Sequence, residues 1–368
     1  MKKIIFLLTG VTWVTLVFSQ TQTYKWWNPV KSNIRTIEGQ GWYDGTESAY
    51  DRLPARAKDR VRKEVWELGK HSAGEYIRFT TNAKEIVVRY QVAGTLNMPH
   101  MPSTGVSGVD LYAKDNREEW RWASAGSYKF GDTIVYNFVH LEVPEDIAEF
   151  RLYLPLYNQP QWLEIGIPEG NSFTFLPVDK IKPVIIYGSS IAQGGCATRP
   201  GLGWTNILNR MIDRPIINLG FSGNGTLDEA VIDLINELEP AVIVLDCLPN
   251  LVDTARFPYD DVKHRLTMSL QKCRAKHPGV PVLLIEHAGG LPGSDLDASR
   301  RNRYNNVNIT FRKIIKDMHK KDLEGVYILR AEEIGLHIES TVDGSHPNDL
   351  GMMQYARACA AALKKIIQ

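Results

Sequence analysis

The sequence is short of cysteine and of excess charge, and both shortages exclude classes of protein. It has 4 cysteines in 368 residues, and no two of them lie close together, so a cysteine metal cluster is not expected. Its 43 lysines and arginines nearly balance its 42 aspartates and glutamates. A net charge of +1 gives no general electrostatic attraction for nucleic acid or anionic lipid. We therefore expect a globular protein that binds neither.

Long hydrophobic runs are also missing, except at the amino terminus. Two lysines precede an apolar stretch over residues 4–18, which ends in Val17-Phe18-Ser19. This pattern predicts a secretory signal peptide over residues 1–19, with cleavage near Ser19–Gln20. The alternative, a short membrane anchor, is less favoured because the stretch is short for a span. We expect an exported mature protein, periplasmic or secreted, with no membrane span.

Export would bring the four cysteines into an oxidising compartment, where pairing is permitted. Four cysteines allow three full pairings, and the sequence does not choose among them. Cys247 ends an apolar run, while Cys273 and Cys359 sit in helical patterns with apolar neighbours. We favour the interpretation that the cysteines, including Cys196, are small buried hydrophobic side chains.

Residues 24–176 carry mostly the two-residue alternation of β-strands. The alternating runs lie at residues 75–80, 85–92, 106–113, 119–123, 133–139, 149–157 and 161–167. Many short strands separated by turn signals predict an antiparallel β-sandwich domain, interrupted by one helix over residues 55–68. Trp120 and Trp122 share one face of a predicted strand. That spacing favours a core or inter-domain contact over a sugar-stacking platform.

After Pro177 the pattern changes to alternating strands and helices. Apolar runs predict strands at residues 184–187, 215–219, 241–247, 281–286 and 326–329. Between two of them, Thr226 and Glu229 stand three residues apart before an apolar helical face, as in a capping box. Alternating β and α units predict an α/β domain over residues 180–368, with a three-layer, doubly wound parallel sheet.

Ser190 is the most informative residue of this second half. Gly188-Ser189-Ser190-Ile191 follows a predicted strand and leads into a helix, which puts a hydroxyl at the carboxyl edge of the sheet. Such a serine becomes a nucleophile only if a base reaches it. Asp343-Gly344-Ser345-His346 supplies an imidazole and an orienting carboxylate from one loop, although a backbone carbonyl could also orient the imidazole. Together they predict a serine hydrolase.

The second half resembles the SGNH (GDSL-type) hydrolase family, whose sequence blocks occur in order over residues 183–368. Gly188-Ser189-Ser190-Ile191 stands where the family has Gly-Asp-Ser-Leu, and Asp343-Gly344-Ser345-His346-Pro347 matches the last block. Between them come Asn218-Leu219-Gly220-Phe221-Ser222-Gly223-Asn224 and Leu248-Pro249-Asn250-Leu251. The sequence departs from the family pattern at Ser189, which replaces aspartate, and at Leu248 and Leu251, which replace glycine and aspartate.

The resemblance implies a flavodoxin-like fold and a role for each matching residue. Ser190 would be the nucleophile, His346 its base and Asp343 the orienting carboxylate. The N–H groups of Ser190 and Gly223, with the side-chain amide of Asn250, would form the oxyanion hole. The resemblance implies no metal and no organic cofactor.

A second resemblance lies in the first half. Gly108-Val109-Asp110-Leu111-Tyr112 matches the Gly-x-Asp-Leu-Tyr motif of a β-rich domain that precedes SGNH domains in bacterial secreted proteins. It implies a bacterial esterase that acts on carbohydrate, so the expected reaction is removal of a short acyl group, acetyl above all. The expected partner is a small-molecule or glycan ester. The alternatives are a lipase, arylesterase or thioesterase of the same fold, and an inactive carbohydrate-binding protein. The presence of both Ser190 and His346 disfavours the inactive protein.

Four further features have two interpretations each. Arg199 and Trp204 follow the nucleophile and are candidate substrate-binding residues, with a surface loop and helix packing as the equal alternative. Glu286-His287 could support the site, but we favour a solvated loop. Arg300-Arg301-Asn302-Arg303 is expected to be a charged helix start rather than a phosphate clamp.

Overall fold

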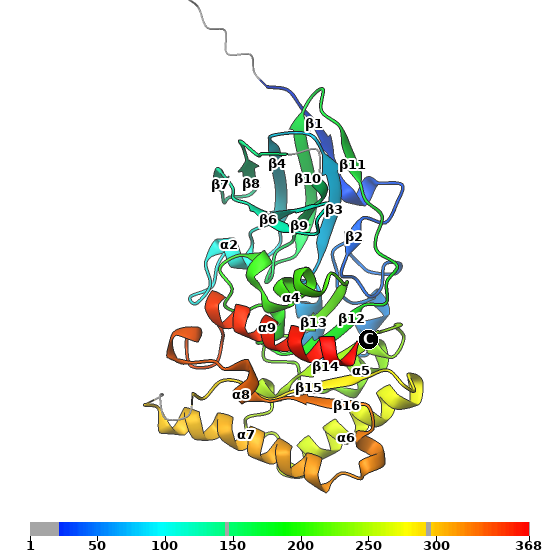
Figure 1. Ribbon diagram of the computed structural model, residues 1–368, viewed down its shortest axis with the longest axis vertical. Helices are drawn as coiled ribbons and strands as arrows, with labels where there is room; N and C mark the ends of the chain where they lie inside the picture. Colours follow the sequence, from blue (N-terminus) through cyan, green and yellow to red (C-terminus); the bar gives the residue numbers. More distant parts are fainter. Residues whose placement is uncertain (1–21, 144–146, 292–295, 368) are drawn as a thin grey trace, which may run out of the picture.

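The computed structural model describes residues 22–143, 147–291 and 296–367, so the predicted signal peptide lies outside the described residues. Figure 1 shows two domains stacked along the long axis of the molecule. The first contains antiparallel sheets, and the second contains one parallel sheet with helices on both faces. The predicted α/β domain preceded by a β-sandwich is therefore confirmed. Within the described ranges, no helix has the length and hydropathy that a membrane crossing needs.

The N-terminal β domain packs two sheets against each other. One sheet has the strand order β1-β10-β4-β8-β7, and the other has β11-β3-β9-β5-β6, with β2 paired to β3. Alternate side chains meet between the sheets, where Ile77, Phe79, Val88 and Tyr90 are fully buried. The two-residue period of the sequence therefore reflects one buried face per strand. The strands are β1 (Tyr24–Trp27), β2 (Ile37–Glu38), β3 (Tyr76–Thr81), β4 (Ile86–Val92), β5 (Asp110–Asp115), β6 (Trp120–Ala123), β7 (Ser127–Lys129), β8 (Ile134–Phe138), β9 (Ile147–Tyr153), β10 (Pro160–Pro168) and β11 (Phe173–Phe175).

Two predicted elements of this domain differ in the structure. The strand predicted at residues 106–113 starts only at Asp110, because Ser103–Val106 forms the short helix α2. The helix predicted at residues 55–68 is broken, and only its second part forms α1 (Lys63–Gly69). The break comes at Arg62, whose extended backbone (φ −61°, ψ 148°) lets its side chain reach the second domain.

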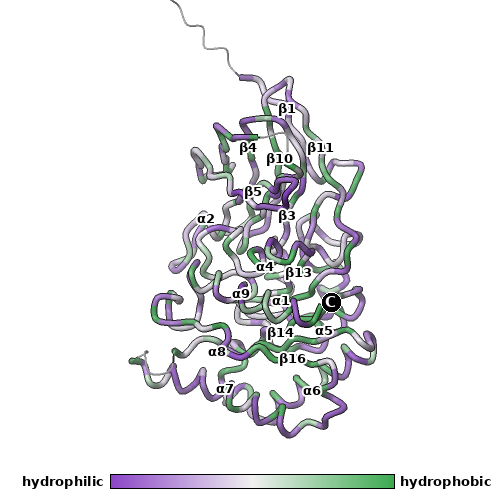
Figure 2. The backbone as a smooth tube through the Cα atoms, viewed as in Figure 1, coloured by the Kyte–Doolittle hydropathy of each residue, from purple (hydrophilic) through white to green (hydrophobic). Residues whose placement is uncertain are grey.

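The C-terminal domain has a five-stranded sheet of order β13-β12-β14-β15-β16 in which every pairing is parallel. Ile185 and Tyr187 of β12 are buried against α5, α6 and α7, and Val184 and Ile186 are buried against α4 and α9. Burial on both faces explains the continuous apolar runs, which form the green stretches through this sheet in Figure 2. The strands are β12 (Val184–Gly188), β13 (Ile216–Gly220), β14 (Val242–Asp246), β15 (Val282–Ile285) and β16 (Val326–Leu329), and the helices are α3 (Ser190–Gln193), α4 (Trp204–Ile212), α5 (Glu229–Ile235), α6 (Tyr259–Lys276), α7 (Ala298–Asp317), α8 (Ala331–Ile334) and α9 (Asp349–Ile366).

The start of α5 differs from the predicted capping box. Asp228, not Thr226, precedes the first helical residue, and the Thr226 hydroxyl donates to the Asp228 carboxylate at 2.8 Å. Leu227 between them has a φ of 55°, which is outside the helical region, so the helix begins two residues later than predicted.

All four cysteines are unpaired and buried, as the preferred interpretation holds. Cys273 lies in the core against the helices of one sheet face, and Cys359 lies in the core of the other. Each therefore behaves as a small apolar side chain.

Arg52 of the N-terminal domain caps the edge of the parallel sheet. β13 is the outermost strand, and Arg52 donates to the carbonyl oxygens of Asn218 and Gly220 on it, each at 2.9 Å. The same guanidinium donates to the carbonyls of Leu68 at 2.7 Å and His71 at 2.6 Å. Burial lowers the pKa of Arg52 to about 10, so the side chain keeps its charge at neutral pH.

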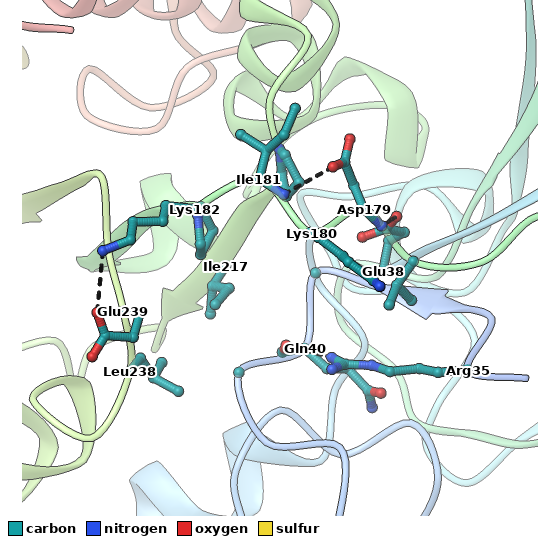
Figure 3. Close-up of a pocket in the computed structure, with 15 residues that line it drawn as sticks. Arg35, Glu38, Gln40, Asp179, Lys180, Ile181, Lys182, Ile217, Leu238 and Glu239 are labelled. Carbon is teal, nitrogen blue, oxygen red and sulfur yellow. Dashed lines mark hydrogen bonds and ion pairs between the residues drawn. The ribbon is translucent and has the colours of Figure 1, made fainter.

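The link between the domains lines a cavity of about 240 Å³ (Figure 3). Arg35 and Glu38 reach it from the β domain, Lys180 from the link, and Ile217 and Leu238 from the α/β domain. The cavity lies at the amino-terminal ends of β12 and β13. It is therefore on the opposite edge of the sheet from Ser190, where a parallel sheet does not normally carry its reaction site.

Candidate active site

The turn after β12 presents Ser190 as the first residue of α3. The preceding Ser189 caps this helix, because its hydroxyl accepts the N–H of Ile191 at 3.3 Å. Serine and aspartate both serve at this capping position, which explains why the replacement of the family's aspartate is compatible with the same turn. Gly188 is required for close packing, since a Cβ there would lie 2.6 Å from the Ala192 Cβ.

The structure brings the three predicted catalytic side chains into one chain of hydrogen bonds. Ser190 Oγ lies 2.8 Å from His346 Nε2, and His346 Nδ1 lies 2.8 Å from Asp343 Oδ2. The other carboxylate oxygen, Oδ1, accepts the backbone N–H groups of Ser345 at 3.0 Å and His346 at 2.8 Å. The Asp343 carboxylate thus orients the imidazole and shapes the loop that carries it.

These hydrogen bonds also fix the charge of Asp343. Partial burial alone would raise its pKa, but the bonds from the His346 side chain and from the two backbone N–H groups hold the pKa well below its usual range. The group is therefore a carboxylate at neutral pH. It accepts a hydrogen bond from the Nδ1–H group of His346. The other ring nitrogen, Nε2, is then unprotonated and can accept the Ser190 hydroxyl proton.

The predicted oxyanion donors lie beside the nucleophile turn. Ser190 begins a helix, and its N–H, like that of Gly223, has no acceptor among the described residues. Gly223 has a φ of 69°, in the left-handed region that favours glycine. The backbone N–H groups of Asn224 and Gly225 face the Asn250 amide and assign its oxygen to their side. In that orientation the oxygen accepts them at 3.0 and 2.9 Å, and the NH₂ group remains a donor.

The two departures around Asn250 have a packing explanation. Leu248 and Leu251 are 3% and 1% exposed and belong to the hydrophobic core on one face of the sheet. They anchor the short turn Leu248–Asn250 by burial, where the family pattern uses glycine and aspartate. Asn250 is then the polar residue that this turn keeps at the edge of the sheet.

The two candidate substrate-binding residues lie away from the cleft near Ser190. Trp204 has no exposed surface and packs on Tyr355, with ring centroids 5.3 Å apart, so the helix-packing alternative describes its position. The Arg199 guanidinium donates to the Asp110 carboxylate and, at 2.7 Å, to the Tyr112 hydroxyl. Both partners belong to the β domain, so Arg199 is held at the domain boundary.

The Gly-x-Asp-Leu-Tyr motif therefore joins the two domains. Besides Arg199, the Asp110 carboxylate accepts the Trp122 indole N–H at 2.8 Å and the Gly201 N–H at 3.0 Å. Arg199 also stacks on the Trp122 ring at 4.1 Å, so Trp122 makes an inter-domain contact although it remains 51% exposed. Trp120 contacts Lys114 and Arg151 of its own domain. Gly108 leaves room for this arrangement, since a Cβ there would lie 2.3 Å from the Thr104 carbonyl oxygen.

A cleft of about 600 Å³ lies next to the loop that carries Gly223, but neither Ser190 nor His346 is among the residues that line it. Ser222 and Asn224, on either side of Gly223, line it, and so does Tyr157, whose hydroxyl donates to the Ser190 carbonyl at 3.1 Å. Most of the wall comes from the N-terminal domain. The lining residues are Lys63, Glu64, Glu67, Leu68, His71, Gly94, Thr95, Met98, Val106, Tyr157, Ser222 and Asn224. The ten lining residues of the N-terminal domain were not predicted from the sequence, because they lie on loops and short helices without a recognisable motif.

Two other polar clusters support the structure around the catalytic loop. Glu286 and His287 are fully buried, so the solvated loop favoured for them is wrong. Glu286 is paired with Arg312 at 2.6 Å, and burial lowers the pKa of His287 to about 3. The charged helix start expected around Arg300 is confirmed, because this residue lies in the first turn of α7.

Comparison with protein families agrees with this geometry. Residues 181–366 match the GDSL-like lipase/acylhydrolase family, and residues 24–173 match the GxDLY domain, the N-terminus of SGNH-hydro-type esterases. No curated protein sequence matches the chain.

Solved structures with both domains are similar to the whole chain. A protein of Bacteroides ovatus described as a GDSL-like lipase has a TM-score of 0.83 and 27% identity, over 94% of this chain and 98% of that one. The salicylyl-acyltransferase SsfX3 of a tetracycline biosynthetic pathway has a TM-score of 0.71 and 19% identity, over 94% and 99%. An acetyl xylan esterase of Butyrivibrio proteoclasticus shares the fold at a TM-score of 0.52 and 11% identity, over 93% and 98%. The chain belongs to the GDSL-like lipase/acylhydrolase family of ester-bond hydrolases, with a GxDLY domain at its N-terminus.

Proposed function

We propose that this protein is an exported esterase that removes short acyl groups, acetyl above all, from carbohydrate. The observation that carries the proposal is the hydrogen-bonded series Ser190–His346–Asp343, with two distances of 2.8 Å, near a cleft of about 600 Å³. Export is inferred from the predicted signal peptide over residues 1–19.

The proposed reaction proceeds through an acyl-enzyme. His346 Nε2 takes the hydroxyl proton as Ser190 Oγ attacks the ester carbonyl carbon, and the negative charge moves to the carbonyl oxygen. Donors from Ser190, Gly223 and Asn250 bind that oxyanion. The intermediate then expels the alcohol, which takes the proton from His346. Water attacks the acyl-serine with His346 again as the base, which releases the carboxylic acid and restores Ser190.

One side of the cleft supports a hydroxylated substrate, although most of the lining is apolar. Lys63, Glu64 and Glu67 place charged groups along one side, and Thr95 adds a hydroxyl. A carbohydrate offers many hydrogen-bond donors and acceptors to such a surface. The alkyl chain of a lipid would remove water from these groups without replacing the lost hydrogen bonds. The acetyl xylan esterase with the same two-domain fold is consistent with this substrate class.

The proposal is tested by measuring acetate release from acetylated polysaccharides and oligosaccharides against hydrolysis of 4-nitrophenyl octanoate. We expect acetate release that is absent in Ser190→Ala. Preference for the octanoate ester would instead favour a lipase, and binding of the glycans without any hydrolysis would indicate an inactive carbohydrate-binding protein. Export is tested separately by the N-terminus of the secreted protein, expected near Gln20.

A further inference from the structure

A histidine of the N-terminal domain lines the cleft near the nucleophile. His71 follows α1, and its ring centroid lies 6.2 Å from that of Tyr157, which bonds to the Ser190 carbonyl. His71 has no part in the hydrolytic steps proposed above, yet the hydrogen bonds around it define its chemistry closely.

Gln193, the last residue of α3, fixes the tautomer of His71. Gln193 Oε1 accepts the N–H of Ser222 at 3.0 Å, and Gln193 Nε2 donates to the Leu156 carbonyl at 3.2 Å. A backbone N–H only donates and a carbonyl only accepts, so the orientation of this amide is determined at both ends. The same Nε2 lies 3.1 Å from His71 Nδ1, which must therefore be the acceptor. A neutral imidazole with an acceptor at Nδ1 carries its proton on Nε2.

The environment keeps this ring neutral. Burial first, and the positive charge of Arg52 second, lower the pKa of His71 to about 3. Arg52 also holds the backbone here, because its Nε donates to the His71 carbonyl at 2.6 Å. No described residue provides a hydrogen-bond partner for His71 Nε2. The cleft wall thus carries one N–H donor of fixed direction, and this donor stays uncharged at neutral pH.

We propose that His71 is a specificity-determining residue whose Nε2–H binds an oxygen of the alcohol portion of the ester. This proposal rests on the proposed hydrolysis at Ser190. An acetyl group has one acceptor oxygen, its carbonyl, and the oxyanion donors take that oxygen. Every ester also has its bridging oxygen, but that oxygen is bonded to the reacting carbon. An acceptor farther from that carbon comes only from a hydroxylated alcohol portion, and a cleft of about 600 Å³ has room for one. An alcohol without such an oxygen leaves the donor unpaired, which is how buried polar groups discriminate between substrates.

Two substitutions separate the donor from the rest of the side chain. His71→Asn puts an oxygen near the position of Nδ1, which keeps the bond from Gln193 but removes the donor. His71→Gln puts an amide nitrogen near the position of Nε2, which keeps a donor in the cleft. His264→Asn changes an exposed histidine on α6 in the same way and is the matched control.

The test compares two acetates with six-membered rings, monoacetylated methyl β-xylopyranoside and cyclohexyl acetate, of which only the first has free hydroxyls. The measured quantity is the ratio of kcat/KM for the two acetates. We expect His71→Asn to lower this ratio roughly 3- to 10-fold, the value of one neutral hydrogen bond. We expect His71→Gln to restore most of the ratio, and His264→Asn to leave it unchanged.

Each other outcome has a definite meaning. An equal loss on both acetates in His71→Asn, or an unchanged ratio, overturns the role of His71 as a donor. Equal loss would show that His71 acts only by positioning Gln193, which accepts the backbone N–H of Ser222. Failure of the wild-type protein to hydrolyse either acetate refutes the proposed function itself. Thermal unfolding of each variant shows whether a lost activity comes from a lost fold.

Discussion

Replacing Asp343 by asparagine should move the proton of the His346 imidazole from Nδ1 to Nε2 and leave the rest of the loop unchanged. Asparagine Oδ1 can accept the same backbone N–H groups, from Ser345 and His346, that the carboxylate accepts at 3.0 and 2.8 Å. The loop should therefore keep its shape. The new NH₂ group, however, faces His346 Nδ1 at a position 2.8 Å away and can only donate to it. The imidazole must then carry its proton on Nε2, where it cannot accept the proton of Ser190.

We expect Asp343→Asn to lower kcat by about 10⁴-fold, the loss known for a triad with the wrong tautomer. This corresponds to about 5 kcal/mol of transition-state stabilisation. KM should change little, because Asp343 does not reach the cleft lining. The assay is hydrolysis of 4-nitrophenyl acetate near neutral pH, together with the thermal unfolding midpoint of both proteins.

One control is specific to this sequence. Asparagine before Gly344 forms an Asn-Gly pair, which deamidates readily and regenerates aspartate. Intact mass therefore has to be measured with each rate, and activity that grows as the mass rises belongs to revertant protein. A homogeneous, folded Asp343→Asn protein with kcat within about tenfold of wild type would refute the assignment of Asp343 as the residue that sets the tautomer.

The remaining predictions concern the nucleophile, the oxyanion site, a buried carboxyl group and the domain boundary. Ser190→Ala and His346→Ala should each abolish most turnover, with the double variant little worse than either, because the residues act as one unit; additive losses in the rate assay would contradict this. Asn250→Ala should lower kcat by roughly 10²–10³ with little change in KM, and an effect on KM alone would mean that Asn250 only positions substrate. Burial raises the pKa of Asp246 to about 8, so the folded state holds a proton that the unfolded state releases from about pH 4 upward, and stability falls over that interval. Asp246→Asn should therefore gain stability relative to wild type as the pH rises from about 4 to 8 in urea unfolding, whereas a pH-independent difference would show that the carboxyl does not titrate this way. Residues 180–368 expressed alone should fold poorly or lose esterase activity, and a stable fragment with full activity would show that the domains are independent.

The sequence was most informative where chemistry and periodicity coincide. Ser190 and His346 are 156 positions apart, yet strand-end glycine and the Asp-x-x-His spacing predicted their meeting at one edge of a parallel sheet. The α/β architecture followed from burial on both faces of every central strand, which leaves a strong apolar signal. The ends of elements were predicted less well. The start of α5, for example, depends on the positive φ of Leu227, which the hydrophobic pattern does not indicate.

The cleft could not be read from the sequence for a physical reason. His71 has no motif around it, and its character comes from Gln193, Arg52 and Leu156, which the fold brings to it from three separate segments. Arg199 shows the converse. A cation that follows a predicted nucleophile in the sequence is a reasonable candidate for substrate binding. The Arg199 guanidinium, however, already donates hydrogen bonds to Asp110 and Tyr112 of the other domain. Long-range partners decide both cases.

The loop that carries Gly223 depends on the domain that contributes no catalytic side chain. Before the loop, Arg52 holds the carbonyls of Asn218 and Gly220, and after it Arg62 donates to the backbone carbonyl of Asn224 at 2.9 Å and to its side chain at 2.6 Å. Removing the β domain would leave the two outer carbonyls of β13 without these donors, at about 1–3 kcal/mol for each one that remains buried. It would also free both ends of the segment that has to hold an N–H group toward the oxyanion. The N-terminal domain is therefore part of the framework of the proposed active site, and a loss of small-ester turnover on its removal would follow from the geometry of Gly223 even if substrate never touched that domain.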